Sequence, residues 1–258
     1  MKLFFNHIPK AGGDSVHQVL GRAFGRFYAN LNTNGFGQIG RATPLEALMR
    51  YTRSPNLLAL GAHAQSPDEF VRHELLETCL GVSIVRDPVA RLGSYYAFVK
   101  GAAHLPYHAL ANEVGIDAFF ETMLKDESHG FTLPSQRSQL MYEITARLSG
   151  EVGEAESIGA IRRFFDRHYL LVGVTERMDL FYDRLQTMLR TILHRPGLVV
   201  EQVHANRTGG GAAAMLSPES MRTFRDRVST DIDLHAHLSD EGVYYNEPLV
   251  AELAKLFR

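Results

Sequence analysis

The stretch LFFNHIPKAGGDS, residues 3–15, decides the fold class. Its apolar first half is typical of a short buried strand, and its two glycines break that strand. Beyond them, apolar residues recur three or four positions apart from Val16 to Phe24, which is the spacing of one helix face. A buried strand that turns through glycines into an amphipathic helix is the unit from which α/β proteins are built. We therefore predict an α/β fold.

The rest of the chain repeats this alternation. Short apolar runs predict further strands at residues 57–60, 80–85 and 169–174. Helical spacing predicts helices at about residues 115–125, 136–149, 156–167 and 177–193. Residues 29–44 are rich in Asn and Gly and are predicted to form a surface loop. Because no repeat and no long linker interrupts the pattern, we expect residues 1–258 to form a single domain.

Composition excludes several classes of protein. The chain has 27 Lys and Arg against 29 Asp and Glu, a net charge of -2, which argues against a polybasic nucleic-acid or membrane-surface binder. Its one cysteine, Cys79, excludes an internal disulfide and a cysteine-only metal cluster. No apolar run reaches the ~18 residues of a transmembrane span. The apolar N-terminal stretch is too short for a signal peptide, so the expected location is the cytoplasm.

The turn at residues 9–15 contains what an anion site needs. Glycines let backbone N–H groups point inward, the start of a helix presents unpaired donors, and Lys10 supplies a compact cation. Lysine is scarce in this chain, where 22 of the 27 basic residues are Arg, yet one stands at this turn. The pattern differs from G-x-x-x-x-G-K-[ST] of ATP- and GTP-binding loops, because the lysine precedes the glycines. The alternative is an ordinary strand-to-helix turn with a solvated lysine.

A second segment, VRDPVARLGSYY at residues 85–96, begins where the strand at 80–85 ends. Strand ends are where α/β sheets bind ligands. Arg86 can fork onto a phosphate with two N–H donors, and Ser94 can add a hydroxyl from about two helical turns further on. Arg91 either joins them or pairs with Asp87, one turn away, and the pairing is the favoured interpretation.

Together the two segments resemble the sulfotransferases that use 3′-phosphoadenosine 5′-phosphosulfate. HIPKAGGDS is similar to their 5′-phosphosulfate loop, usually HIPKTGGTS, and RDPVARLGSYY is similar to their 3′-phosphate motif. The likeness is greatest to the heparan sulfate 2-O-sulfotransferase branch and to bacterial carbohydrate sulfotransferases, where a Gly-x-His strand end stands between the motifs, as Gly61–His63 does here. VGVTE at 172–176 and HANRTG at 204–209 extend the likeness, and the latter resembles a late loop over the adenine and 3′-phosphate.

The resemblance implies a P-loop-kinase-like three-layer fold with a central parallel sheet flanked by helices. It implies an O-sulfotransferase that needs no metal and acts on a hydroxyl of a carbohydrate or glycoconjugate. It also implies which residues bind the donor: Lys10, Gly12, Gly13, Asp14 and Ser15 at the sulfated end, and Arg86, Ser94, Arg207, Thr208 and Gly209 at the 3′-phosphate and adenosine end. Two of these positions depart from the family pattern. Ala11 lacks the usual hydroxyl, and Asp14 either lies beside the anionic donor or caps the following helix.

Sulfuryl transfer to a hydroxyl needs a cation at the leaving oxygen and a base at the acceptor. Lys10 suits the first role. His63 suits the second, because histidine accepts protons near neutral pH and His63 follows a strand end. His17 is the rival base, and His7 is interpreted as a packing residue.

Four other histidines have weaker interpretations. His104 and His108 contact either the acceptor or only solvent. His235 and His237 form an H-x-H pair that we interpret as a solvated helix face rather than a metal site, because positions i and i+2 of a helix face apart.

Two other function classes stay open. One is a small-molecule kinase on the same fold, against which the missing G-K-[ST] sequence counts. The other is a non-catalytic nucleotide-binding module, which would be favoured if His63 were buried away from the turn at residues 10–15.

Overall fold

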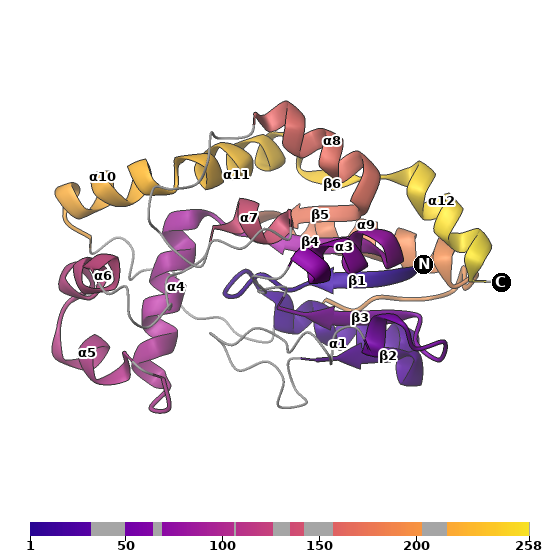
Figure 1. Ribbon diagram of the computed structural model, residues 1–258, viewed down its shortest axis with the longest axis horizontal. Coiled ribbons are helices and arrows are strands. Elements are labelled where there is room, and N and C mark those ends of the chain that lie inside the picture. Colours follow the sequence, from indigo (N-terminus) through magenta and orange to yellow (C-terminus); the bar gives the residue numbers. More distant parts are fainter. Residues whose placement is uncertain are drawn as a thin grey trace.

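A six-stranded sheet runs through the part of the chain that this computed structural model describes (Figure 1). The described residues are 1–31, 50–63, 69–105, 107–125, 135–141, 157–202 and 216–257. The strand order is β2-β3-β1-β4-β5-β6, and only β6, at one edge, runs antiparallel to its neighbour. The strands are β1 (Lys2–Asn6), β2 (Tyr28–Asn30), β3 (Ala59–Ala62), β4 (Cys79–Val85), β5 (Tyr169–Val174) and β6 (Val243–Tyr245). The predicted α/β class is confirmed.

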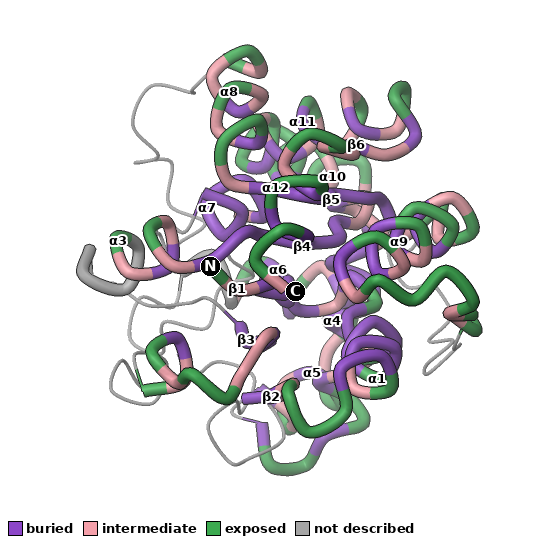
Figure 2. Tube along the Cα trace, turned by 90° about the vertical axis from the view of Figure 1, so that its right-hand side faces the viewer, coloured by how far each residue is buried: buried purple, intermediate pink, exposed green. Residues whose placement is uncertain are grey.

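Helices cover both faces of this sheet. Figure 2 shows α1 and α9 on one side of it and α3 and α8 on the other. The described helices are α1 (Gly13–Phe24), α3 (Glu69–Thr78), α4 (Pro88–Gly101), α5 (His108–Glu113), α6 (Ile116–Lys125), α7 (Gln136–Leu140), α8 (Ile158–His168), α9 (Met178–Ile192), α10 (Pro218–Arg227), α11 (Ser229–Glu241) and α12 (Glu247–Leu256), with short 3-10 turns η1 (Gly25–Phe27) and η3 (Thr175–Arg177). None of them is long and apolar enough to cross a membrane.

The central strands explain why the sequence reveals this sheet so clearly. Every residue of β4 and β5 is buried, and so are four of the five residues of β1. A parallel strand with helices on both faces has no solvent side and therefore forms a continuous apolar run. These are the runs from which the strands near residues 3, 80 and 169 were predicted.

A second apolar cluster lies away from the sheet, among α4, α5, α6 and α10 at the left of Figure 1. Aromatic rings fill it: Phe119 meets Tyr96 edge-on with centroids 5.1 Å apart, and Phe120 meets Phe224 at 5.5 Å. Helix α4 connects the two parts because it begins just after β4 and contributes Tyr96 to this second cluster. We call this group of helices the helical lobe.

Two local predictions differ from the structure or go beyond what it describes, and one strand was missed. The stretch 29–44 was predicted as a loop, but its first residues belong to β2, and β6 was not predicted at all. Both strands have only three residues, too few to show an alternating pattern. Helix α7 ends at Leu140, and the remainder of the helix predicted at 136–149 lies outside the described residues after position 141.

Candidate functional site

The carboxyl ends of β1 and β4 form the candidate site. These strands are parallel neighbours, with Asn6 of β1 opposite Ser83 of β4. After β1 the chain continues to β2 and β3, whereas after β4 it continues to β5, on the opposite side of the pair. The edge between two strands whose connections diverge in this way is where open α/β sheets bind ligands. Both segments singled out in the sequence leave the sheet at this edge.

The turn after β1 has an unusual backbone. Lys10 has φ 68° and Gly12 has φ 87°, both in the left-handed region. That region is uncommon for a residue with a side chain, and such residues cluster at functional sites. Helix α1 starts at Gly13 with Gly12 as its cap and without a capping side chain, so the first N–H groups of the helix are available to an anion. Asp14 lies within the first turn, not at the capping position.

Gly13 lets the turn close tightly. A Cβ atom at this position would lie 2.1 Å from the imidazole ring of His7, a separation at which atoms clash. Only glycine therefore allows α1 to begin this close to the end of β1.

Two side chains hold the turn against the neighbouring strands. Thr175, just after β5, places its hydroxyl oxygen 2.8 Å from the carbonyl oxygen of Ala11 and 2.9 Å from that of Val85. Arg91 of α4, only 2% exposed, donates from Nε to the carbonyl oxygen of Pro9 at 2.9 Å. The resemblance had marked the segment around Thr175, and the structure gives its hydroxyl a tethering role.

The favoured pairing of Arg91 with Asp87 is wrong. The Asp87 side chain instead caps α4, accepting a hydrogen bond from the Ala90 amide at 2.7 Å. Sequence spacing alone could not separate these outcomes, because a residue before a Pro at a helix start is equally suited to capping. Burial lowers the pKa of Arg91 to about 10, against the opposing effect of Asp231, so this guanidinium remains charged at neutral pH.

Arg86 links the two strand ends. Its Nη1 donates to the carbonyl oxygen of Lys10 at 3.3 Å. Its Nε is buried and has no hydrogen-bond partner among the residues that the structure describes. A buried N–H that lacks a partner costs free energy, and an anion bound at this edge would supply one. Ser94, predicted to assist Arg86, is buried in α4.

Lys10 projects its side chain from the turn toward α4. Its Nζ lies 4.2 Å from the centroid of the Phe98 ring, a cation–π contact. Burial lowers the pKa of Lys10, Asp14 opposes this effect, and the charge of Arg86 adds to it. Two cations close enough to depress a pKa favour an anion between them.

Three buried histidines form a hydrogen-bonded chain behind the turn. His63 places Nδ1 2.7 Å from the backbone carbonyl oxygen of His7. A carbonyl only accepts, so Nδ1 of His63 carries the proton and Nε2 is its basic nitrogen. His17 bonds through Nε2 to Nδ1 of His7 at 3.1 Å and through Nδ1 to the hydroxyl of Tyr28. Both ring nitrogens of His17, the rival base, are therefore engaged.

The packing interpretation of His7 was incomplete, because His7 bonds to both other histidines. The centroid of its ring lies 4.3 Å from that of His63, with the two ring planes tilted by 32°. Position 17 could have been recognised from the sequence, since it falls among the buried positions of the predicted helix. The pairing of His7 with His63 could not, because 56 residues separate them.

Burial keeps these imidazoles neutral. It lowers the pKa of His63 to about 4, even though the His7 carbonyl and Asp14 act in the opposite direction. It lowers the pKa of His17 to about 3, with a further lowering by His63, and that of His7 well below its ordinary value. At neutral pH His63 is therefore an unprotonated, uncharged base.

These shifts predict that acid destabilises the fold. An unfolded histidine binds a proton near pH 6.5, whereas folded His63 binds one only near pH 4, so the free energy of unfolding should fall as pH drops through this window. Each such histidine contributes a slope of up to about 1.4 kcal/mol per pH unit. Urea denaturation at pH 7, 6 and 5 measures it, and His63→Gln should flatten the dependence. An unchanged slope in that variant would assign the acid sensitivity to other groups.

The structure also shows the contacts of His235, His237 and His108. His235 bonds to Glu176 at 3.0 Å, and His237 pairs with Glu241 at 3.5 Å, so the H-x-H residues do face apart. With only 15% of its side chain exposed, His235 is less solvated than expected. His108 contacts the carbonyl oxygen of Val99 at 3.0 Å, within the helical lobe.

Across the described part of the chain, no three His, Cys, Asp or Glu side chains are grouped so that they could hold a metal. Arg207, Thr208 and Gly209 lie outside the described residues.

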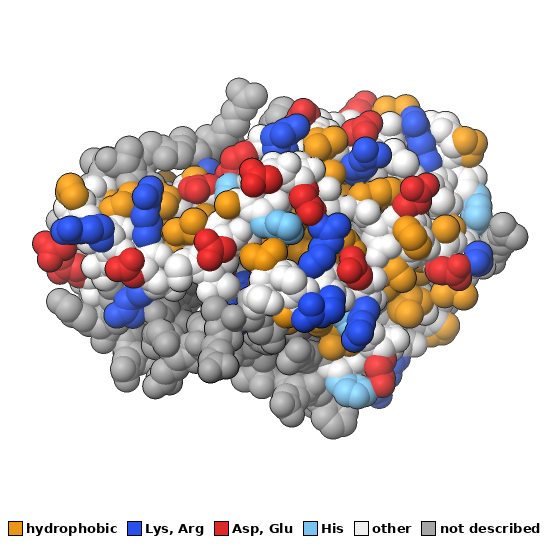
Figure 3. All heavy atoms as spheres, turned by 90° about the horizontal axis from the view of Figure 1, so that it is seen from above, with side chains coloured by type: hydrophobic (Ala, Val, Ile, Leu, Met, Phe, Trp, Pro, Cys, Tyr) orange, Lys and Arg blue, Asp and Glu red, His pale blue; other side chains and the backbone are white. Residues whose placement is uncertain are grey.

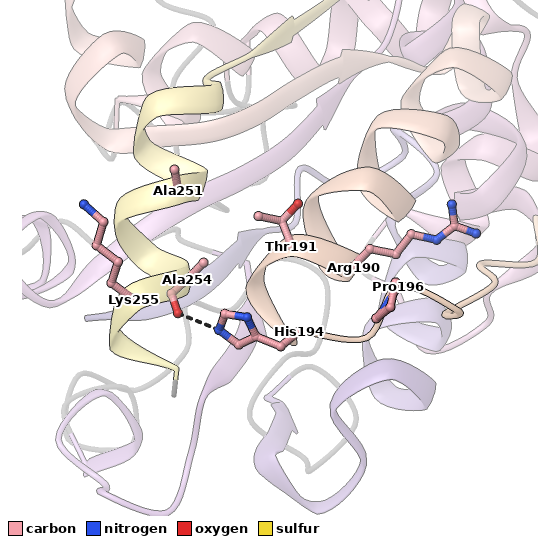
Figure 4. Close-up of a pocket in the computed structure, with 7 residues that line it drawn as sticks. All are labelled: Arg190, Thr191, His194, Pro196, Ala251, Ala254 and Lys255. Carbon is pink, nitrogen blue, oxygen red and sulfur yellow. Dashed lines mark hydrogen bonds between the residues drawn. The ribbon is translucent and has the colours of Figure 1, made fainter.

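An open groove of about 500 Å³ lies elsewhere, between the end of α9 and α12 (Figure 4). His194 crosses it and donates to the carbonyl oxygen of Ala254 at 2.9 Å. Because α9 starts at the carboxyl edge of the sheet and runs back along it, its last turn lies at the opposite edge. The groove is therefore separate from the candidate site.

The chain matches no protein-family model and no curated protein.

Proposed function

We propose that the protein is an O-sulfotransferase that moves a sulfuryl group from 3′-phosphoadenosine 5′-phosphosulfate to an acceptor hydroxyl. One observation carries the proposal: Arg86 after β4 touches the Lys10 carbonyl after β1, and its Nε is buried without a partner among the described residues. Two cationic segments thus meet where a ligand with an anion at each end would span them. In this proposal the mostly parallel sheet is P-loop-kinase-like.

The residues present suit such a donor. At the sulfated end, Lys10, Gly12, Gly13 and Ser15 supply a cation, a left-handed turn and the start of α1. At the other end, Arg86 and Ser94 are assigned to the 3′-phosphate. Asp14 is exposed and raises the pKa of both Lys10 and His63, so it is assigned to balance the positive charge rather than to hold the donor.

The proposed reaction is a single in-line displacement. The acceptor oxygen bonds to sulfur while the bond between sulfur and the 5′-phosphate oxygen breaks. Nε2 of His63 takes the hydroxyl proton, because Nδ1 is already held by the His7 carbonyl. Lys10 stabilises the negative charge that develops on the leaving oxygen.

The acceptor is proposed to be a hydroxyl of a carbohydrate or glycoconjugate. On the face formed by α8, α10 and α11, acidic and basic side chains are interspersed (Figure 3). Ion pairs such as Arg162–Glu241, at 2.5 Å, neutralise part of that charge. This face therefore offers no uniformly basic surface for a long polyanion.

A thermal-shift comparison tests the donor. A ligand that binds only the folded state raises the melting temperature, and it raises it more when its affinity or its concentration is higher. We expect 3′-phosphoadenosine 5′-phosphate to stabilise the protein strongly and ATP with magnesium to stabilise it weakly. Stabilisation by ATP with magnesium alone would favour a kinase and overturn the proposal.

Replacing Arg86 tests the 3′-phosphate assignment. Arg86→Ala should weaken binding of 3′-phosphoadenosine 5′-phosphate by about 10- to 100-fold, the range for losing a hydrogen bond to a charged group. Adenosine 5′-phosphate, which lacks the 3′-phosphate, should lose little. Arg22→Ala, which removes an exposed arginine paired with Glu201, is the matched control. Equal losses for both nucleotides in Arg86→Ala would make Arg86 structural.

A further inference from the structure

The side chain of Gln136 forms hydrogen bonds with both the amide and the carbonyl group of Arg86. The Arg86 amide donates to Oε1 of Gln136 at 2.9 Å, and Nε2 of Gln136 donates to the Arg86 carbonyl oxygen at 2.7 Å. Gln136 comes from α7, 50 positions along the chain, and is only 2% exposed. Two opposed hydrogen bonds to one residue fix the orientation of its backbone and hence the direction in which its side chain leaves.

The sheet cannot provide these bonds. On the β1 side the pairing of β4 ends with Ser83 opposite Asn6, and on the β5 side it ends with Val85 opposite Val174. Arg86 lies three residues beyond Ser83 and one beyond Val85, so its N–H and C=O need partners from elsewhere. The amide of Gln136 offers one acceptor and one donor and replaces a neighbouring strand.

Asp231 of α11 holds Gln136 in place. Its carboxylate accepts hydrogen bonds from the backbone amides of Gln136 at 2.8 Å and Arg137 at 3.0 Å, and from the Ser135 hydroxyl at 2.7 Å. Asp231 is itself buried. A carboxylate with three donors at the start of α7 anchors that helix firmly. Helices α7 and α11 are thereby connected to the end of β4.

We propose that Gln136 is a positioning residue that orients Arg86 for the 3′-phosphate, and that Asp231 holds Gln136 in place. The inference rests on the proposed function. Its physical basis is that Arg86 must satisfy two requirements at once. Nη1 donates to the Lys10 carbonyl, and in the proposed function the buried Nε, which has no partner among the described residues, donates to the ligand. A small rotation of the Arg86 backbone would therefore weaken one of the two bonds.

The experiment measures a ratio, the Kd of adenosine 5′-phosphate over that of 3′-phosphoadenosine 5′-phosphate, by calorimetry on the full chain. Gln136→Leu removes both bonds, and the isosteric Gln136→Glu keeps the acceptor but loses the donor. We expect the ratio to fall about tenfold in Gln136→Leu and less in Gln136→Glu, while adenosine 5′-phosphate affinity changes by about twofold or less. In an Arg86→Ala background, Gln136→Leu should change the ratio by less than about twofold.

Gln139→Leu is the matched control, because Gln139 is a buried glutamine on the same helix whose side-chain amide donates to Ser135. Its ratio should stay at the wild-type value. If Gln136→Leu does not fold, the same ratio of dissociation constants is measured in Gln136→Glu and Asp231→Asn instead. A wild-type ratio near one would overturn the proposed function itself. A high wild-type ratio that survives both Gln136 substitutions, or an equal loss for both nucleotides, would overturn only the role of Gln136.

Discussion

Lys10→Ala is expected to reduce turnover by about 10²- to 10³-fold, the range for removing one group that stabilises a developing oxyanion. Binding of 3′-phosphoadenosine 5′-phosphate should weaken only modestly. The difference arises because charge on the leaving oxygen is greatest in the transition state, so a cation placed there acts mainly on rate. Rapid-quench or coupled assays of sulfuryl transfer, combined with calorimetry for the nucleotide product, separate the two quantities.

Lys10→Ala should leave the backbone conformation of the turn unchanged. Alanine retains Cβ, so the cost of the left-handed conformation at φ 68° stays similar to that of lysine. Lys100→Ala is a matched control, since Lys100 is exposed in the last turn of α4 and its Nζ lies 5.4 Å from the centroid of the Tyr96 ring. If Lys10→Ala lost as much product affinity as turnover, Lys10 would bind the ground state and its assigned role would be wrong.

The sheet could be predicted because its central strands are buried on both faces. Each of β1, β4 and β5 forms a mostly apolar run, which the sequence displays directly. The edge strands β2 and β6 could not be predicted, because three residues carry no period and their pairing depends on neighbours far along the chain. Strand order, too, needs the structure.

The residues of the candidate site also fall into those that the sequence predicts and those that it does not. Lys10 and Arg86 could be recognised because each stands in a local strand-to-helix pattern with a chemical meaning. The residues that position them could not. Gln136 and Asp231 contact each other across 95 positions, and nothing in their local sequence marks them as partners of Arg86. For Arg91 the local sequence was misleading. Its spacing indicated an ion pair with Asp87, whereas in the structure its Nε donates to the carbonyl oxygen of Pro9.

His63→Ala is expected to have the largest effect, a loss of about 10²- to 10⁴-fold in turnover, which is the contribution of a positioned general base. Donor affinity should remain nearly intact, since the assigned role of His63 lies on the acceptor side. The His7 carbonyl fixes its tautomer, and burial holds its pKa at about 4, so the imidazole is unprotonated at neutral pH. The wild-type rate should therefore be retained well below pH 6.5 and fall only as His63 becomes protonated.

Three measurements make this prediction specific. The acid limb of the pH–rate profile should disappear in His63→Ala, because no imidazole remains to be protonated at that step. A phenolic acceptor, whose hydroxyl is already acidic, should lose less rate than an alcohol, since it depends less on a base. His194→Ala removes a histidine with the same kind of carbonyl contact, 2.9 Å to Ala254 in the remote groove, and should keep its turnover. Near wild-type turnover in His63→Ala would place the base on another residue, and an equal loss with phenol and alcohol acceptors would make His63 a structural support of the turn.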